Sequence, residues 1–205
     1  MKIALVTMAA LSGIATASVY VESDNAESLN INQATAGAPA AVATITLDLS
    51  GINTWDLFGD PDNLVMILDG GPFANELSRV IGVGWDVTIE TFDGSWLSEA
   101  TIAIENSDQS GSFFVGPGSG IDTSGIQSFS SGGLVDLVNE GLDFTLNEDG
   151  DFRIEFYETF DDNPDLVDAE FLAGSTLRIQ YTIIPAPGSI ALLGLGGLMS
   201  VRRRR

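Results

Sequence analysis

Residues 151–158 read DFRIEFYE, and this stretch decides the fold class. Its apolar residues alternate with Arg153 and Glu155, which is the period-two pattern of a strand with one face in a core. The apolar positions are Phe152, Ile154 and Phe156. The stretch therefore predicts a β-strand that buries its aromatic residues and turns its charged side chains outward.

The same alternation recurs along the chain, so we expect a protein made mainly of strands. The segments are residues 44–50 (TITLDLS), 83–90 (VGWDVTIE), 101–105 (TIAIE), 142–146 (LDFTL) and 177–183 (LRIQYTI). Clusters of Gly, Asp and Ser separate them, such as LDGG, FDGS, GPGSG, SSGG and NEDGD, and these residue types reverse a chain. Several short strands with polar turns predict an all-β sandwich or barrel.

Three local features refine this expectation. The continuous apolar run at residues 64–68 (LVMIL) predicts a strand that is covered on both faces. Residues 132–141 (GGLVDLVNEG) predict one helical turn with Leu134, Leu137 and Val138 on one face. Residues 18–38 are polar and rich in alanine, so they hold either one edge strand or a partly ordered lead-in.

The composition excludes several classes of function. The chain has 205 residues with 29 acidic and 8 basic side chains, and it contains no His and no Cys. A surface this negative repels nucleic acid and anionic lipid headgroups. Without His or Cys there is no thiol nucleophile and no Ser-His-Asp triad. Paired carboxylates can hydrolyse a glycosidic bond, but no pair stands out among so many acids, so we expect no catalytic activity and no catalytic residue.

The start of the chain has the three parts of a secretory signal. Lys2 precedes a short apolar run, and Ala15-Thr16-Ala17 has the small-x-small pattern that signal peptidase accepts. We expect cleavage near Ala17, so that residues 1–17 are removed and the body works outside the cytoplasm. The alternative, an uncleaved anchor, fits less well because the apolar run is shorter than a membrane span requires.

Two acid-rich loops raise the question of a cation. Residues 158–171 contain a dense group of carboxylate and amide side chains that match the oxygen ligands of calcium. The candidate calcium ligands are Asp161, Asp162, Asn163, Asp165 and Asp168. A second group, in WDLFGDPDN at residues 55–63, offers Asp56, Asp60, Asp62 and Asn63. Neither spacing matches an EF-hand loop, and the alternative is two solvated acidic loops whose Asp and Asn residues form turns.

The tryptophans allow a second interpretation. Trp85 shares the register of the buried positions in residues 83–90, so we expect it in the core. Trp55 and Trp96 stand beside turns, where they either edge the core or stack on a sugar ring. A carbohydrate-binding module is therefore an alternative, and it would need an exposed row of aromatic side chains.

The last 21 residues differ from everything before them. Residues 185–205 read PAPGSIALLGLGGLMSVRRRR, with Pro185, Ala186 and Pro187 followed by a Gly- and Leu-rich apolar run. The run ends in a membrane-stop cluster, Arg202, Arg203, Arg204 and Arg205. Arginines after an apolar segment stay on the cytoplasmic side, so the body lies on the other side. The run is short for a permanent span, which favours a temporary anchor over a lasting one.

This three-part tail resembles the PEP-CTERM sorting domain in a Pro-Ala-Pro variant, with Ala186 where the family name has Glu. The resemblance implies that an exosortase-type enzyme recognises residues 185–187, removes the tail and passes the protein outward. Bacteria with this system typically make an exopolysaccharide matrix. Residues 84–106, 129–133 and 152–162 distantly resemble the sandwich domains of such proteins and the P-domain jelly roll of proprotein convertases, which have no catalytic residues of their own.

Together these observations predict one jelly-roll-like β-sandwich over residues 18–184, between a signal peptide and a C-terminal apolar helix at residues 185–205. The expected role is a structural or adhesive protein of the cell surface or extracellular matrix. The expected partners are an exosortase-type enzyme and an exopolysaccharide, with no nucleic acid. The membrane is involved only through the tail before processing, while the arginines are cytoplasmic. A small carboxylate-dependent enzyme acting on glycans is a further alternative.

Overall fold

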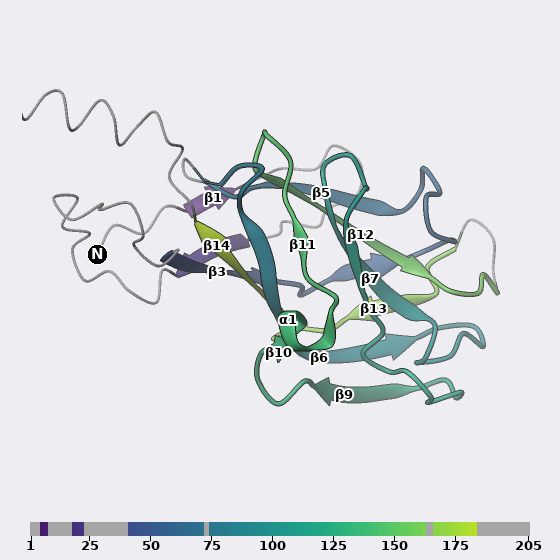
Figure 1. The fold of residues 1–205 in the computed structure, drawn as a ribbon. Helices are drawn as coiled ribbons and strands as arrows, with labels where there is room; N and C mark the ends of the chain where they lie inside the picture. Colours follow the sequence, from purple (N-terminus) through teal and green to yellow (C-terminus); the bar gives the residue numbers. More distant parts are fainter. Residues whose placement is uncertain (1–4, 8–17, 23–40, 72–73, 163–165, 184–205) are drawn as a thin grey trace, which may run out of the picture.

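The computed structural model describes residues 5–7, 18–22, 41–71, 74–162 and 166–183. Within these residues, fourteen β-strands form two sheets, and all strand pairs are antiparallel (Figure 1). One short helix is present beside them. The predicted all-β class and the two-sheet architecture are therefore confirmed. In the described part of the chain, no helix has the length and apolar character needed to cross a membrane.

The larger sheet is ordered β1-β2-β3-β14-β6-β13-β4, and three further strands pair with β6. Its strands are β1 (Leu5–Thr7), β2 (Ser18–Glu22), β3 (Ala41–Asp48), β4 (Ile52–Thr54), β6 (Arg79–Thr91), β9 (Ile126–Ser130), β10 (Val135–Asp136), β11 (Phe144–Thr145), β13 (Ala169–Phe171) and β14 (Thr176–Ile183). The smaller sheet is ordered β5-β12-β7-β8. Its strands are β5 (Leu64–Asp69), β7 (Ala100–Asn106), β8 (Ser112–Val115) and β12 (Asp151–Glu158).

Strand β6 is the organising strand of the larger sheet. One edge of β6 pairs with β14 and β13, and the opposite edge pairs with β9, β10 and β11. At 13 residues, β6 is long enough to carry several short partners in succession along each edge. Strand β2 lies in the segment predicted to hold either one edge strand or a partly ordered lead-in. It is a strand, but it pairs with β1 on one side and β3 on the other and is therefore not at an edge.

The core lies between the two sheets and is built from their inward-facing residues. Phe156 of β12 contacts Phe171 of β13 edge to face, with ring centroids 5.8 Å apart. Phe152 contacts Tyr181 of β14 in the same way at 5.1 Å. Ile154, between these two phenylalanines, is also fully buried. The alternation predicted for residues 151–158 is therefore confirmed, and β12 is a central strand of the smaller sheet.

Other inward positions also follow the predicted alternation. The register of β6 buries Val83, Val87 and Ile89, and Trp85 packs partly buried against the same core. In β14, Leu177, Ile179 and Tyr181 are buried.

Three local predictions were wrong or only partly right. The apolar run at residues 64–68 forms β5, an edge strand, and leaves Val65 and Ile67 39% and 44% exposed. The predicted helical turn is confirmed as α1 (Leu137–Glu140), but of the three apolar residues expected to share one face only Leu137 is buried, because a single turn offers one inward position between its Asp136 N-cap and the left-handed Gly141. In residues 142–146, Leu142 is exposed and the strand shrinks to the two residues of β11.

Candidate functional site

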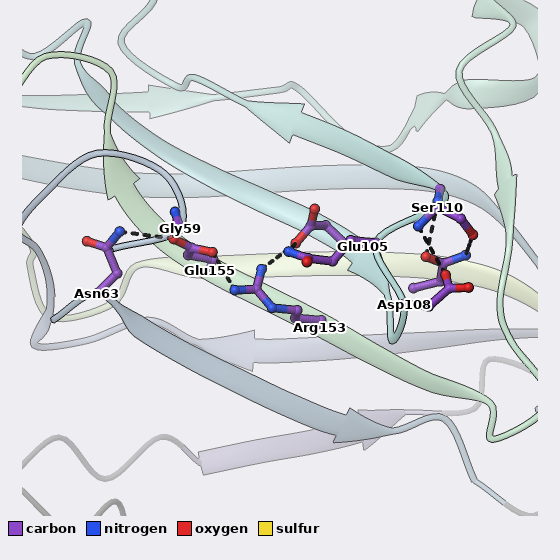
Figure 2. A network of polar contacts seen from close by, with 10 residues as sticks. Gly59, Asn63, Glu105, Asp108, Ser110, Arg153 and Glu155 are labelled. Carbon is purple, nitrogen blue, oxygen red and sulfur yellow. Dashed lines mark hydrogen bonds and ion pairs between the residues drawn. The ribbon is translucent and has the colours of Figure 1, made fainter. Parts of the chain in front are cut away.

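The outer face of the smaller sheet carries a closed charge network. Arg153 of β12 donates to Glu105 of β7 and to Glu155 of its own strand, the latter at 2.6 Å (Figure 2). All three side chains are largely buried, with exposed side-chain fractions of 16% for Arg153, 3% for Glu105 and 0% for Glu155. The sequence pattern correctly placed Arg153 and Glu155 on the outer face of the sheet. It did not predict that a loop covers these side chains and buries them.

The cover is the loop at residues 55–63. The Gly59 amide and the Asn63 side-chain amide donate to Glu155 Oε1 at 2.6 and 2.9 Å, so both oxygens of this carboxylate are satisfied (Figure 2). Phe58 of the same loop lies over the Arg153 guanidinium, with the ring centroid 6.0 Å away. Because donors and rings of its own chain surround it, this network is a structural element of the loop and sheet.

A different arrangement occurs where β12 ends. Glu158 continues the inward positions of Phe152, Ile154 and Phe156, so its side chain is directed to the inside of the sandwich and is 0% exposed. The Thr54 hydroxyl of β4 donates to Glu158 Oε1, and Glu158 Oε2 is buried with no hydrogen-bond partner. A carboxylate oxygen without a donor in the interior is costly.

Three further carboxyl groups surround Glu158, and all three interact with it electrostatically. Asp168 precedes β13 and accepts a hydrogen bond from the buried Ser95 hydroxyl at 2.9 Å. Glu99 precedes β7, accepts from the Trp96 amide at 2.7 Å and interacts electrostatically with Asp162 and Asp168. We refer to Glu99, Glu158, Asp162 and Asp168 as the carboxylate cluster.

The environment of the carboxylate cluster favours protonation. Burial raises the pKa of Glu158 to about 8, and the nearby Asp168 charge adds to the shift, while the Thr54 hydrogen bond opposes it. Burial also raises the pKa of Glu99, with a smaller contribution from the charges of Asp162 and Asp168. Buried groups that repel one another in this way are under electrostatic stress unless a proton or a cation relieves it.

The sequence-predicted calcium ligands are only partly brought together. Asp162 and Asp168 lie in the carboxylate cluster, and Asp161 is half-buried with one oxygen, Oδ1, that has no hydrogen-bond partner. Asn163 and Asp165 lie outside the described residues. So do the other predicted site residues, which are Ala15, Ala17, Pro185, Ala186, Pro187, Arg202, Arg203, Arg204 and Arg205.

Sequence reasoning missed two members of the cluster. The signal for Glu158 was available, because it occupies the next inward position of the alternation that begins at Phe152. Glu99 had no such signal, since the WLSEA stretch around it shows no alternation and its position depends on a turn. Backbone hydrogen bonds set this turn: Thr159 donates to Glu99 at 3.0 Å, and Phe92 donates to Asp168 at 2.8 Å.

The second acid-rich loop also gathers its carboxylates. Each of Asp56, Asp60 and Asp62 places one oxygen within 4.8 Å of the others. Asp60 also accepts from the Asp62 amide at 3.0 Å, as expected of an Asp-containing turn. The loop adjoins the carboxylate cluster, because the Glu158 amide donates to the Asp56 carbonyl at 2.9 Å.

Among the described residues, the exposed aromatic side chains are Phe58, Phe114, Trp96 and Phe160. Phe58 and Phe114 are exposed beside the charge network and meet each other and Tyr157 edge to face, at 5.2 to 6.5 Å between ring centroids. Trp96 is exposed next to the carboxylate cluster. Trp55 is half-buried. The edge-to-face geometry gives a faceted surface and not a flat row of rings.

Comparisons with known proteins give no family. No family model matches the chain, and no curated protein matches it. Among solved structures, it is similar to the VP2 subviral particle of infectious bursal disease virus, at 13% identity and a TM-score of 0.32 over 80% of this chain. The T13 particle of the same virus gives 12% identity and a TM-score of 0.25 over 71% of this chain. The chain spans 49% and 36% of those two proteins, respectively.

Proposed function

We propose that this chain is a structural or adhesive protein without catalytic activity, delivered to the cell surface or the extracellular matrix. The observation that carries the proposal is the inaccessibility of its best-placed carboxylates. Glu105 and Glu155 are bound by Arg153, and Glu158 is fully buried, so a polymeric substrate has no route to them. General acid–base catalysis requires direct contact, or contact through one water, with the reacting group.

The delivery part of the proposal rests on the sequence. A signal segment at residues 1–17 and the PEP-CTERM-like tail at residues 185–205 both lie mainly or wholly outside the described residues. Removal of the tail by an exosortase-type enzyme and a brief stay in the inner membrane follow from the resemblance. The jelly-roll-like order of the strands and the C-terminal apolar helix are likewise predictions that rest on the sequence.

Mass spectrometry of the protein from its native host tests the delivery. We expect the mature chain to begin near Ser18 and to end near Pro187. A mass that retains Arg202 to Arg205 would contradict the removable tail. Deletion of the gene should change cell aggregation, attachment or matrix texture, and purified protein should turn over neither polysaccharides nor peptides. Hydrolysis that disappears when one acid is replaced, in a protein that still folds, would instead support the glycan-active enzyme.

A carbohydrate-binding module is the second candidate, because Phe58 and Phe114 are exposed on one face. Sugar rings stack on aromatic faces, and a Phe58→Ala variant would remove one of them. A glycan array separates the two candidates. Binding of one glycan class by the wild type, and its loss in Phe58→Ala, would favour the module; no binding above background would favour the structural role.

A further inference from the structure

A cavity of about 350 Å³ lies between β11 of the larger sheet and the turn that joins β7 to β8 in the smaller one. Its lining includes Arg79 at the start of β6, Ser110 and Gly111 of the turn, and Asp143 and Thr145 at β11. This volume falls at the lower end of the range of about 300–1,000 Å³ found for small-molecule sites. No member of the carboxylate cluster or of the charge network lines the cavity, so it is a separate feature of the molecule.

Asn106 fixes the two walls of the cavity relative to each other. Its buried Nδ2 group donates to the Ser110 hydroxyl of the turn at 3.0 Å and to the Thr145 carbonyl of β11 at 3.2 Å, and its Oδ1 atom accepts from the Gly111 amide at 3.0 Å. Gly111 allows the turn to approach β11 closely, because a Cβ at this position would lie 2.9 Å from the Phe144 Cβ atom. The cavity is therefore preformed, which lowers the entropic cost of binding a ligand.

The cavity offers hydrogen-bonding groups of both kinds. Arg79 Nε donates to Asp143 Oδ2, and this ion pair leaves Nη1 and Nη2 of the guanidinium and Oδ1 of the carboxylate without a partner among the described residues. Thr145 is the register partner of Arg79 and is exposed, and its hydroxyl forms no hydrogen bond within the described part of the chain. Donors and acceptors therefore line the same cavity, and the opposite charges of the ion pair cancel.

These groups suit a neutral ligand that is rich in hydroxyl groups. An anion would be attracted by Arg79 but repelled by Asp143 and by the net charge of −21, and a cation would be repelled by Arg79. A zwitterion would have to separate the ion pair to use both of its charges. A sugar hydroxyl both donates and accepts, so adjacent hydroxyls can receive the two Nη groups of Arg79 and donate to Asp143 or Thr145, while the ion pair stays intact.

We propose that this cavity binds one neutral sugar residue of a glycan. Arg79 donates to two neighbouring hydroxyls of the sugar ring, and Asp143 and Thr145 accept from its other hydroxyls. The inference rests on the proposed adhesive role, which it deepens by naming a ligand class and the residues that select it. The site is distinct from the exposed rings of Phe58 and Phe114, which would hold a sugar by stacking instead of by hydrogen bonds.

Magnetic resonance titration of the purified, isotope-labelled full chain tests the site. The probes are glucose, galactose, mannose and N-acetylglucosamine. At least one of these sugars should shift the amide signals of residues 110–111 and 143–145 and leave those of residues 55–63 unchanged. The shift should saturate with a Kd of about 0.1–10 mM, because a few hydrogen bonds in an open cavity give a low affinity. The measurement needs neither export nor cells, so it can fail while the proposed structural role holds.

Three variants localise the sugar. Arg79→Lys keeps a positive charge beside Asp143 but removes the Nη fork, so the protein should fold and bind the sugar at least about 10-fold more weakly. Thr145→Val keeps the branched shape at an exposed strand position and should weaken binding by about 3- to 10-fold. Arg178→Lys is the matched control, because Arg178 forms another exposed ion pair, with Asp86, and it should bind the sugar as the wild type does.

Three outcomes would overturn the proposal. The first is no shift with any of the sugars at about 50 mM, which is above the expected Kd. The second is a shift that persists in Arg79→Lys; its loss in Arg178→Lys would then place the sugar in a separate cavity of about 280 Å³ beside Asp86 and Thr88. The third is tighter binding of glucuronate or of free glycine than of every neutral sugar, which would identify an anion or zwitterion site. Saturable binding of a neutral sugar that is weakened in Arg79→Lys and kept in Arg178→Lys supports the site as assigned.

Discussion

Glu155 and Glu158 lie three residues apart on strand β12 and project from opposite faces of it. Glu155 is paired with a cation, whereas Glu158 is not. Glu155 is on the outer face and meets Arg153 together with two amide donors. Glu158 is on the inner face, and its one hydrogen-bonded oxygen receives the Thr54 hydroxyl. One strand thus carries a neutralised carboxylate and a carboxylate whose second oxygen has no partner among the described residues.

Replacing Arg153 should be far more damaging than replacing an exposed arginine. Arg153→Met leaves Glu105 and Glu155 buried without their cation, and we expect a loss of about 3–5 kcal/mol in the free energy of unfolding. Arg178→Met is the matched control, because Arg178 and its partner Asp86 are both substantially exposed, and it should cost less than about 1 kcal/mol. Urea unfolding measures both, and similar losses would show that the network is not a stabilising element.

Thr54 is expected to stabilise the fold through its buried hydroxyl, which has the Glu158 Oε1 atom and, at 3.4 Å, the Ala169 carbonyl oxygen as acceptors. Thr54→Val keeps the shape of the side chain but removes the donor to Glu158 Oε1, so the protein should lose about 1–3 kcal/mol of stability. Thr88→Val removes a hydroxyl that pairs with Ser128 at an exposed site, and it should change stability by less than about 0.5 kcal/mol. Denaturant midpoints for the two variants should differ clearly; coincident midpoints would contradict the role of Thr54.

Two glycines in one turn, Gly116 and Gly118, should differ in how well they tolerate a methyl group. A Cβ at Gly118 would overlap the Leu97 carbonyl oxygen, so Gly118→Ala should cost at least about 1–3 kcal/mol. A Cβ at Gly116 would have its nearest neighbours, Ser119 and Thr101, at 3.9 Å, which is ordinary contact. Gly116→Ala should therefore leave the Tm nearly unchanged. An equally tolerated Gly118→Ala would mean that the turn can move away from Leu97.

Tyr181 should make the fold sensitive to alkali. Burial raises its pKa to about 12, with a smaller contribution from Asp69, and its hydroxyl donates to the Gly70 carbonyl at 2.7 Å. The folded state retains this proton longer than the unfolded chain, so the stabilisation is complete below pH 10 and is lost as the pH rises toward 12.

Tyr181→Phe isolates this contribution. The stability difference between wild type and Tyr181→Phe should be constant below pH 10 and should then shrink by up to about 1.4 kcal/mol per pH unit. Urea unfolding from pH 8 to pH 11.5 measures the difference. A difference that stays constant to pH 11.5 would show that Tyr181 ionises as readily in the folded protein as in the unfolded chain.

Alternation predicted the strands that lie in the middle of a sheet. Residues 151–158 and 177–183 have neighbours on both sides, and in β12 this regular environment enforces a strict inner and outer face. The prediction that residues 64–68 form a strand covered on both faces was wrong, because this strand lies at an edge of the sheet. An edge strand tolerates exposed apolar side chains that a central strand would cover. Its composition gives no indication of which position in the sheet it takes.

The candidate site was harder to predict because it depends on long-range contacts. Asp162 and Asp168 were found from the density of acids in one loop. Glu99 lies 59 positions before Glu158 and 69 before Asp168, so only the fold brings it close to them. The charge network on the outer face was missed in another way. Its charged residues were placed correctly, but nothing in residues 55–63 reveals that this loop folds over them.

The position of β14 has a consequence for how the protein is made. Ile179 pairs with Ile45 of β3 on one side and with Val83 of β6 on the other. A nascent chain still attached to the ribosome cannot join β3 to β6 until residues 176–183 have emerged. The larger sheet therefore closes late, and such non-local pairing is slow to form. Until then the chain can be threaded through a narrow export channel, which is the state that the proposed secretion requires.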